Sequence, residues 1–443
     1  MKQKHIQKTQ ITSSIIVFCF FVSVLPAISS SFIGVPQSPG VSQDSTHLST
    51  DLYNPKVAAA LSQITEGRLR EILTVLVGFS PRFTGTYGCE QAANYIYDFF
   101  QSNHLQTRYH NWSSWGNEYH RRFFSSRNIE ATIPGTDKKN TVLLFSAHYD
   151  GVKSAPAAND DGSGTAAVLL SAAVLNQFSF NHTLKFVAFS GEEIGLLGSH
   201  AYAKESYENH ENILLNINAD MIGHAETSEG GSRMGISSSE DLAWLFDIAD
   251  SLCSIYDIDL TISRGSIDRD GRGWSDYFSF IEYGYEAFAC WGGEHDPNMH
   301  TSKDDLNNVN FSYLVKTTRL ITALLGTLAD YEDFYPQVTI ASPRIGKLYI
   351  EGREKRSIGD LKTIVLNDIW IWADVRYASV PILRAEFYLD DRLMYTDTQV
   401  PFSWQFNKFS VGTHRVTILV YDELGRKSSE YRDIRFINLL LKK

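Results

Sequence analysis

Short apolar runs alternate with helix-length patterns between Pro55 and Asp333, and this alternation restricts the fold more than any other feature of the sequence. Short continuous apolar runs are typical of strands that are buried on both faces of a parallel sheet. The clearest runs cover residues 142–146, 184–189, 213–218 and 285–290. Helical patterns cover residues 163–178, 241–255 and 311–331, and another starts at about 194. The rhythm predicts an α/β domain at 55–333, with a mainly parallel mixed sheet and helices on both faces.

The pattern changes after Tyr335 and Pro336. Runs rich in Val, Ile, Tyr, Phe and Trp now recur about every ten residues and are separated by turn signals. Examples are residues 369–373, 385–389 and 416–421. This pattern predicts a small all-β sandwich at 334–443.

The N-terminus has the features of an export signal. Lys2, Lys4 and Lys8 precede an apolar run at 14–25, and small residues follow Pro26. That run is shorter than the ~20 residues that span a bilayer, so we expect a signal peptide at 1–30 and a linker at 31–54. We therefore expect a secreted or cell-surface protein, and an uncleaved membrane anchor stays open as the alternative.

Net charge limits the possible partners, and cysteine spacing limits the possible disulfides. The formal net charge is -11, yet residues 334–443 carry 17 Lys and Arg against 13 Asp and Glu, so the rest of the chain carries the whole acidic excess. An acidic body argues against nucleic acid as a partner, because phosphate binding needs clustered Lys and Arg. Cys89, Cys253 and Cys290 have no CxxC spacing, which leaves one disulfide or buried free thiols, and we expect the thiols.

Histidines and carboxylates follow the ends of the predicted strands, where ligands bind in parallel α/β sheets. His148 and Asp150 are two residues apart on a strand and point to the same side, so His148 can bind a metal with support from Asp150. Asp160 lies in a turn at 159–164, where Gly162 and Gly164 allow a close backbone approach. Asp160 can present its carboxylate to two metal ions there, and a helix cap is the alternative.

The next two strands end in further carboxylates. Glu192 and Glu193 are adjacent, and a cation offsets the cost of burying two like charges. Glu193 can bind the metal while Glu192 acts as general base, and stabilisation of a helix N-terminus is the alternative. Asp220 follows another strand and His300 lies in a late loop, positions that would otherwise suit a turn residue and a solvated histidine. Two histidines and three carboxylates suit zinc.

The order of these groups resembles the M28 family of two-zinc aminopeptidases, which includes the bacterial leucyl aminopeptidases. The resemblance runs from about Glu66 to Tyr331. Its motifs are PRFTG (81–85), HYD (148–150), NDDGSG (159–164), GEEIGLLGS (191–199), NADMIG (218–223), SDYFSFIEYGYEAF (275–288) and HTSKDD (300–305). Two small departures are Ser302, where relatives often carry Pro, and Tyr277, where many carry His.

The resemblance implies a secreted aminopeptidase that hydrolyses the N-terminal peptide bond of peptide substrates. It implies two zinc ions per chain, held by Asp160 as a bridge, by His148 and Asp220 on one side, and by Glu193 and His300 on the other. Glu192 would be the general base for the water shared by the two ions, and Asp150 would support His148. Asp276 and Asp304 fall in the family's motifs and are assigned supporting roles only.

Three rival functions remain open at this point. Relatives on the same fold perform glutaminyl cyclisation, typically with one zinc and a changed NDDGSG pattern. Carboxypeptidases occur in the broader family, and some relatives have lost ligands and act only in binding. The intact ligand set favours the aminopeptidase over all three.

The C-terminal part resembles the bacterial immunoglobulin-like modules of secreted enzymes. The residues that carry this resemblance are 385–390, 401–404 and 411–422. The Cys…Trp…Cys pattern of antibody domains is absent, so no disulfide between the sheets is expected. A module of this kind can contact a cell surface or polymer, and the alternative is that it only stabilises or tethers the enzyme.

Overall fold

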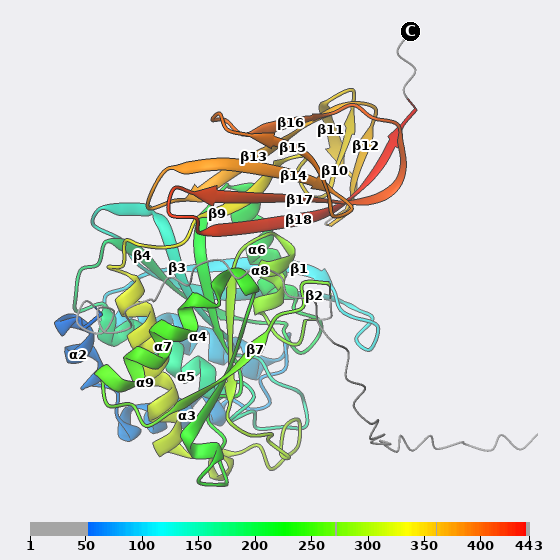
Figure 1. Ribbon diagram of the computed structural model, residues 1–443. Coiled ribbons are helices and arrows are strands. Elements are labelled where there is room, and N and C mark those ends of the chain that lie inside the picture. Colours follow the sequence, from blue (N-terminus) through cyan, green and yellow to red (C-terminus); the bar gives the residue numbers. More distant parts are fainter. Residues whose placement is uncertain (1–51, 271–272, 360, 440–443) are drawn as a thin grey trace, which may run out of the picture. The chain divides into compact units, whose positions relative to one another are not determined.

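The apolar run predicted as a strand at 142–146 lies inside a mixed eight-stranded sheet, as part of β3 (Lys138–His148) (Figure 1). The structure is a computed structural model that describes residues 52–270, 273–359 and 361–439. The strand order is β1-β2-β4-β3-β5-β8-β6-β7. The other strands are β1 (Gln106–Trp115), β2 (Phe123–Ile133), β4 (His182–Phe189), β5 (Asn212–Ala219), β6 (Arg233–Ser238), β7 (Thr261–Ser266) and β8 (Ala287–Gly292).

The four central strands run parallel, so their carboxyl ends meet at one edge of the sheet. Parallel pairing joins β4 to β3, β3 to β5 and β5 to β8. In β3, Leu143 and Phe145 enter one core and Val142 and Leu144 enter another. Burial on both faces explains why this strand is a continuous apolar run rather than an alternating one.

Helices cover both faces of the sheet, which confirms the predicted fold class. The first core contains residues from six helices: α2 (Pro55–Leu61), α3 (Glu66–Gly78), α4 (Tyr87–Ser102), α5 (Gly162–Leu175), α7 (Trp244–Ile255) and α9 (Phe311–Leu328). The core on the opposite face contains residues from α6 (Leu197–Glu208) and α8 (Tyr277–Glu282). Short 3-10 turns lie at Gly230–Ser232, Glu240–Leu242 and Leu306–Asn308.

Several element boundaries differ from the predicted ones by a few residues. The helix expected from about 194 begins at Leu197, because Gly195 and Leu196 both have positive φ. The pattern at 241–255 divides into a 3-10 turn and α7. The hairpin of β1 and β2, which pairs antiparallel with β4, was not predicted, and neither was β6, which runs antiparallel to β8.

The C-terminal part folds into two packed sheets, as the periodic runs predicted. The larger sheet has the order β11-β10-β12-β18-β17-β14-β15, and the smaller has the order β16-β13-β9. Alternate residues of β17, including Val416, Ile418 and Val420, fill the core between them. The strands are β9 (Gln337–Ser342), β10 (Lys347–Ile350), β11 (Arg353–Ser357), β12 (Thr363–Leu366), β13 (Ile369–Tyr377), β14 (Ile382–Leu389), β15 (Arg392–Asp397), β16 (Ser403–Phe406), β17 (Ser410–Asp422) and β18 (Lys427–Asn438).

The sandwich and the α/β part share contacts and belong to one compact unit, Thr46–Lys443. Ile345 of the sandwich joins the core formed by α6 and α8. Phe334, placed by sequence at the start of the sandwich, packs in the α/β core instead. Arg376 of β13 donates a hydrogen bond to the carbonyl of Gly284, at 3.0 Å.

The expected signal peptide at 1–30 and most of the expected linker at 31–54 lie outside the described residues. The last linker residues belong to the folded part, since Leu52 is buried and Asn54 caps α2. Among the described residues, none of the helices combines the length and the apolar character needed to span a membrane. Cys89, Cys253 and Cys290 are buried free thiols, as expected.

Candidate metal centre

The structure brings all five predicted ligands together at the carboxyl edge of the sheet. His148 ends β3, Asp220 follows β5, Glu193 follows β4, and Asp160 precedes α5. The fifth ligand, His300, comes from the loop before α9. Their ligand atoms form two overlapping groups, His148 with Asp160 and Asp220, and Asp160 with Glu193 and His300.

Asp160 belongs to both groups because its two carboxylate oxygens face different histidines. Its Oδ1 lies 3.3 Å from Nε2 of His148, and its Oδ2 lies 3.0 Å from Nε2 of His300. The second group closes with Oε2 of Glu193, 3.2 Å from Nε2 of His300. The first closes with Oδ1 of Asp220, 3.7 Å from Nε2 of His148. One carboxylate is thus placed to bridge two cations.

The neighbouring Asp161 takes the capping role that was the alternative for Asp160. Asp161 caps α5 by accepting a hydrogen bond from the backbone N–H of Gly164, at 2.8 Å, which leaves Asp160 free to face the site. A Cβ at Gly164 would lie 2.5 Å from the carbonyl oxygen of Ala219, so the close approach expected there requires glycine.

Asp304 holds the backbone of the turn that carries Asp160. Its carboxylate accepts hydrogen bonds from the N–H groups of Asn159, at 2.7 Å, and Asp160, at 3.1 Å. The Asn159 side chain donates in turn to Asp296, at 2.8 Å. Asp304 therefore has the supporting role that its place in the motif suggested, and it acts on the turn rather than on a metal.

His148 is oriented for metal binding through Nε2. Its Nδ1 lies 3.2 Å from the carbonyl oxygen of Asp150, which fixes the proton on Nδ1 and leaves Nε2 to accept a cation. The carboxylate of Asp150 is further from Nδ1, at 3.7 Å. It accepts hydrogen bonds from Thr84, at 2.8 Å, and from the N–H of Glu192, at 3.3 Å. Asp150 thus connects residues 148–150 by a hydrogen bond to the segment that carries Glu192 and Glu193.

Glu192 lies beside the ligands without belonging to either group. Its Oε2 is 4.0 Å from Nε2 of His148, and its side chain is 13% exposed. Burial raises the pKa of Glu192 well above its usual value, and burial raises that of Glu193 to about 7. The contacts with Asp160 and Glu193 raise the pKa of His300 to about 10. Burial opposes ionisation of Asp160, but contact with the two histidines outweighs it and lowers its pKa.

The donor set fits a pair of zinc ions. His148 Nε2, Glu193 Oε1 and Asp220 Oδ1 are buried and make no hydrogen bond with any described residue. Burying unpaired polar atoms is costly, and cations at the two groups would satisfy them. Imidazole and carboxylate are ligands that zinc binds well.

Arg82 is a structural residue of this site to which sequence reasoning gave no role. It is fully buried and donates hydrogen bonds to the carbonyls of Tyr149, Pro156 and Ala157, at 2.7, 3.0 and 2.7 Å. It thereby holds the segment between β3 and the Asp160 turn. Its place in the PRFTG motif marked it, but the motif does not show that backbone carbonyls are its partners.

Asp276 and the aromatic residues near it form the wall behind Asp220. Asp276 is fully buried, neither of its oxygens has a hydrogen-bond partner among the described residues, and burial raises its pKa to about 7. Tyr277 packs edge-on against Trp291, with ring centroids 6.0 Å apart. Trp274 is 80% exposed beside them.

Without metal, the protein should lose stability as pH rises from about 5 to 8. Glu193 has a folded pKa of about 7 and His300 one of about 10, both above their unfolded values of about 4.3 and 6.5. A raised folded pKa stabilises the fold below the unfolded pKa, and that stabilisation disappears as pH rises through the folded pKa. We expect the melting temperature in chelator to fall over this range, and to fall less for Glu193→Gln. A metal-free protein that is more stable at the higher pH would contradict this assignment.

A mixed sheet with overlapping histidine and carboxylate groups at its carboxyl edge defines a metallohydrolase-like α/β protein. The sequence match is more specific: residues 128–325 match the model of the family described as Peptidase family M28. The predicted resemblance is therefore confirmed.

Named relatives agree with this assignment. Aminopeptidase Y of Saccharomyces cerevisiae is 30% identical over 230 residues, which cover 48% of this chain and 41% of that protein. Leucine aminopeptidase 1 of Sclerotinia sclerotiorum is 27% identical over 297 residues, which cover 61% of this chain and 73% of that protein. The chain thus spans less than half of the length of the first relative.

Solved structures share the fold. A zinc aminopeptidase from Bacillus subtilis has a TM-score of 0.53 at 17% identity, over 61% of this chain and 96% of that one. Glutaminyl cyclase from Fimbriiglobus ruber has a TM-score of 0.51 at 17% identity, over 60% of this chain and 95% of that one. The fold alone therefore does not separate these two reactions.

Proposed function

We propose that this protein is a secreted aminopeptidase that binds two zinc ions and removes the first residue from peptides. The observation that carries the proposal is the position of Asp160 between two complete ligand groups. His148 and Asp220 would hold one ion with Asp160, and Glu193 and His300 would hold the other. Peptidases with two metal ions use them to activate water and the scissile carbonyl.

Glu192 would be the residue that moves the proton. It belongs to neither ligand group, and its Oε2 lies 4.0 Å from Nε2 of His148. Its carboxylate would take a proton from the attacking water and deliver it to the leaving amine. Its backbone N–H donates to Asp150, which helps to hold the residue in place. Gly191 before it has φ +83, and a Cβ there would lie 2.7 Å from the Trp112 ring.

The proposed site would hold the amino end of a peptide. Carboxylates of Asp160, Glu192, Glu193 and Asp220 converge there, and two zinc ions would balance their charge, so a free substrate amine could bind at one of the ions. A carboxypeptidase needs a cation to hold the substrate carboxylate. Arg82 does not serve this purpose, since it is fully buried and bonded to backbone carbonyls.

Acetylation of the substrate tests the exopeptidase assignment. We expect release of amino acids from unblocked peptides and at least about a hundredfold slower release from the same peptides with an acetylated N-terminus, because acetylation removes the charged amine. The measurement is a chromatographic time course of the free amino acid, with C-terminally amidated peptides as the control. Equal cleavage of acetylated and unblocked peptides would reject the proposal.

Glutaminyl cyclisation is the competing reaction on this fold. The intact NDDGSG turn and the second ligand group favour hydrolysis, because cyclases of this fold typically work with one zinc ion. Incubation with a peptide that begins with Gln separates the two, since a cyclase yields a pyroglutamyl peptide and an aminopeptidase yields free Gln.

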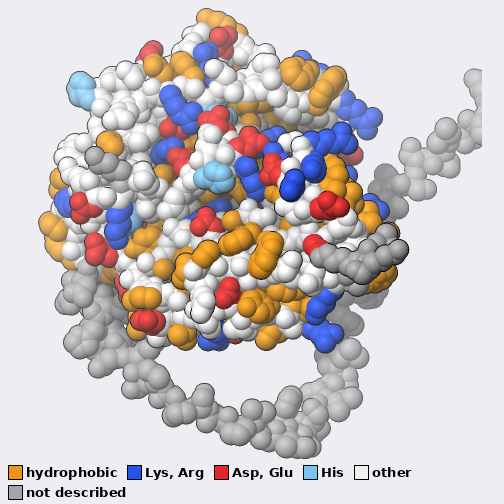
Figure 2. All heavy atoms as spheres, turned by 90° about the horizontal axis from the view of Figure 1, so that it is seen from above, with side chains coloured by type: hydrophobic (Ala, Val, Ile, Leu, Met, Phe, Trp, Pro, Cys, Tyr) orange, Lys and Arg blue, Asp and Glu red, His pale blue; other side chains and the backbone are white. Residues whose placement is uncertain are grey.

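Export and surface contact complete the proposal. The basic and apolar N-terminal pattern supports secretion or display at the cell surface, with an uncleaved anchor as the alternative. The proposed partners are peptide substrates, and through the sandwich a cell surface or polymer. Basic and acidic side chains are interspersed on the face in Figure 2, which gives no support to a nucleic-acid partner.

A further inference from the structure

Residues 267–270, which follow β7, contact both parts of the molecule. Asp270 contacts the sandwich, and Ile267 packs against the cluster of Tyr277 and Trp291, next to Asp276. The sandwich can therefore influence the site through these four residues.

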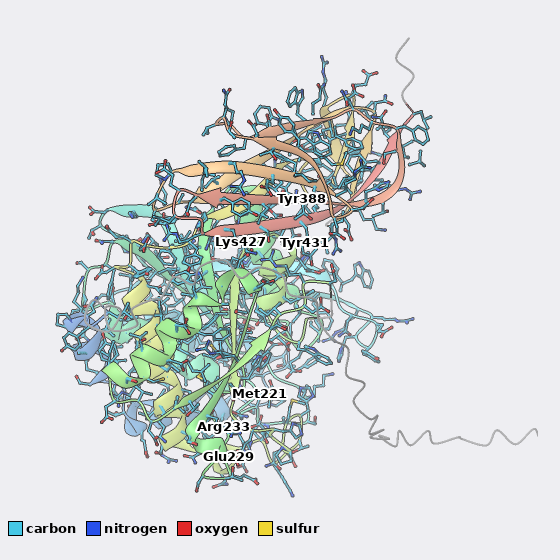
Figure 3. All side chains as sticks on the ribbon, viewed as in Figure 1. Met221, Glu229, Arg233, Tyr388, Lys427 and Tyr431 are labelled. Atoms are coloured by element: carbon cyan, nitrogen blue, oxygen red, sulfur yellow. The ribbon has the colours of Figure 1, made fainter. Side chains whose placement is uncertain are left out.

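Arg415 of β17 holds Asp270 with two parallel hydrogen bonds. Its Nη1 and Nη2 lie 2.8 Å from Oδ2 and Oδ1 of Asp270. Tyr431 of β18, labelled in Figure 3, donates its hydroxyl to the same Oδ1, at 3.0 Å. The guanidinium group lies over the Tyr431 ring, 4.2 Å from its centroid, and Asp433 accepts from its Nε, at 3.0 Å.

The network differs from an isolated surface ion pair. Exposed ion pairs contribute little to stability on average. An arginine that donates two hydrogen bonds to one carboxylate within a network, however, has a fixed geometry. The Arg415 side chain is 32% exposed, and the aromatic ring and two carboxylates limit its rotation. Arg415 and Tyr431, on adjacent strands of one sheet, thus hold one loop carboxylate, and Asp433 holds Arg415.

Arg269, the residue before Asp270, is held by the α/β part of the protein. It pairs with Glu286, at 2.5 Å, and both side chains are nearly buried, at 14% and 10% exposure. Glu286 also accepts the hydroxyl of Ser239, at 2.6 Å. The backbone at 269–270 is therefore fixed by the α/β part through Arg269 and by the sandwich through Asp270.

Ile267 connects residues 267–270 to the site. It packs against the cluster of Tyr277 and Trp291, and the N–H of Tyr277 donates to Asn218 of β5, at 3.2 Å. A shift at Asp270 would thus be passed on through Ile267 to residues beside the metal centre.

We propose that the sandwich helps to shape the active site, in which Arg415 and Tyr431 are positioning residues. They hold residues 267–270 through Asp270 and, through Ile267, the cluster of Tyr277 and Trp291 beside the metal centre. This inference rests on the proposed aminopeptidase function. The contacts position substrate and do not take part in bond breaking. Their loss should therefore raise KM and leave kcat and zinc content almost unchanged.

The test compares Arg415→Ala with Arg384→Ala in the full-length, zinc-loaded protein. Arg384 is a matched control because it lies on β14 of the same sheet and has a side chain that is 33% exposed, and because its ion pair among the described residues, with Glu386 at 2.7 Å, lies within the sandwich. We expect KM to rise about fivefold for Arg415→Ala with kcat within about twofold of wild type, and no change for Arg384→Ala. Asp270→Asn should reproduce the effect, and the double variant should add little to either single change.

A second readout does not depend on activity. Hydrogen exchange followed by mass spectrometry should show faster exchange in the peptide that contains residues 267–270 for Arg415→Ala, and unchanged exchange there for Arg384→Ala. Unchanged exchange, or faster exchange with unaltered KM, would overturn the inference. A wild-type protein that shows no aminopeptidase activity would instead overturn the proposed function, so the two failures are distinguishable.

Discussion

Replacing Glu192 with glutamine is expected to lower kcat about a thousandfold while zinc content and KM stay close to wild type. The amide keeps the size of the side chain but cannot accept a proton from water. Glu192 belongs to neither ligand group, and its Oε2 lies 4.0 Å from Nε2 of His148. The measurement is steady-state hydrolysis of an aminoacyl chromophore together with elemental analysis of the same sample.

The adjacent Glu193 provides the matched control. Glu193→Gln makes the same chemical change one residue along the chain, but it removes a carboxylate that lies 3.2 Å from His300 within a ligand group. We expect this variant to lose zinc and to recover part of its activity in excess zinc, whereas Glu192→Gln should not respond. A Glu192→Gln protein that keeps half of the wild-type turnover would remove the general-base role.

Replacing Asp160 with alanine is expected to empty both zinc sites and to reduce activity by about three orders of magnitude or more. One carboxylate contacts the histidines of both groups, so its loss removes a ligand from each. Bound zinc, measured after gel filtration, should fall from about two ions per chain to well below one. The variant should melt like chelated wild-type protein, which shows that the fold itself is retained.

Substitutions that each alter only one ligand group distinguish the loss of a shared ligand from the loss of a ligand to one site. Asp220→Asn alters only the group that contains His148, and Glu193→Gln alters only the group that contains His300. Each should retain about one zinc ion, unlike Asp160→Ala. Equal zinc content in all three variants would contradict the bridging role of Asp160.

Four of the five ligand positions could be predicted from local signals, because three come at the ends of strongly apolar strands and Asp160 lies in a turn with two glycines. His148, Glu193 and Asp220 come after strands that are buried on both faces, and parallel strands bring their carboxyl ends to one edge. His300 had no such local signal, since it lies in a loop, and only the family motif placed it. The helix cap considered for the NDDGSG turn is made by Asp161, while Asp160 belongs to both candidate ligand groups.

Other features depend on contacts that local patterns do not show. β1 is an edge strand with only two buried residues in ten, so it lacks the apolar pattern that predicted the central strands. The partners of Arg82 are backbone carbonyls, which any residue type supplies. The contact between Arg415 and Asp270 joins residues 145 positions apart in the chain. Nothing near either residue indicates that the sandwich reaches the segment beside the metal centre.

Asp160 is expected to lie between two cations, and anomalous diffraction at the zinc edge tests this position most directly. Crystals of the zinc-loaded protein should show two strong peaks, one beside His148 and Asp220 and the other beside Glu193 and His300, with the Asp160 carboxylate between them. A single peak, peaks away from these side chains, or no peak in a fully active sample would contradict the account.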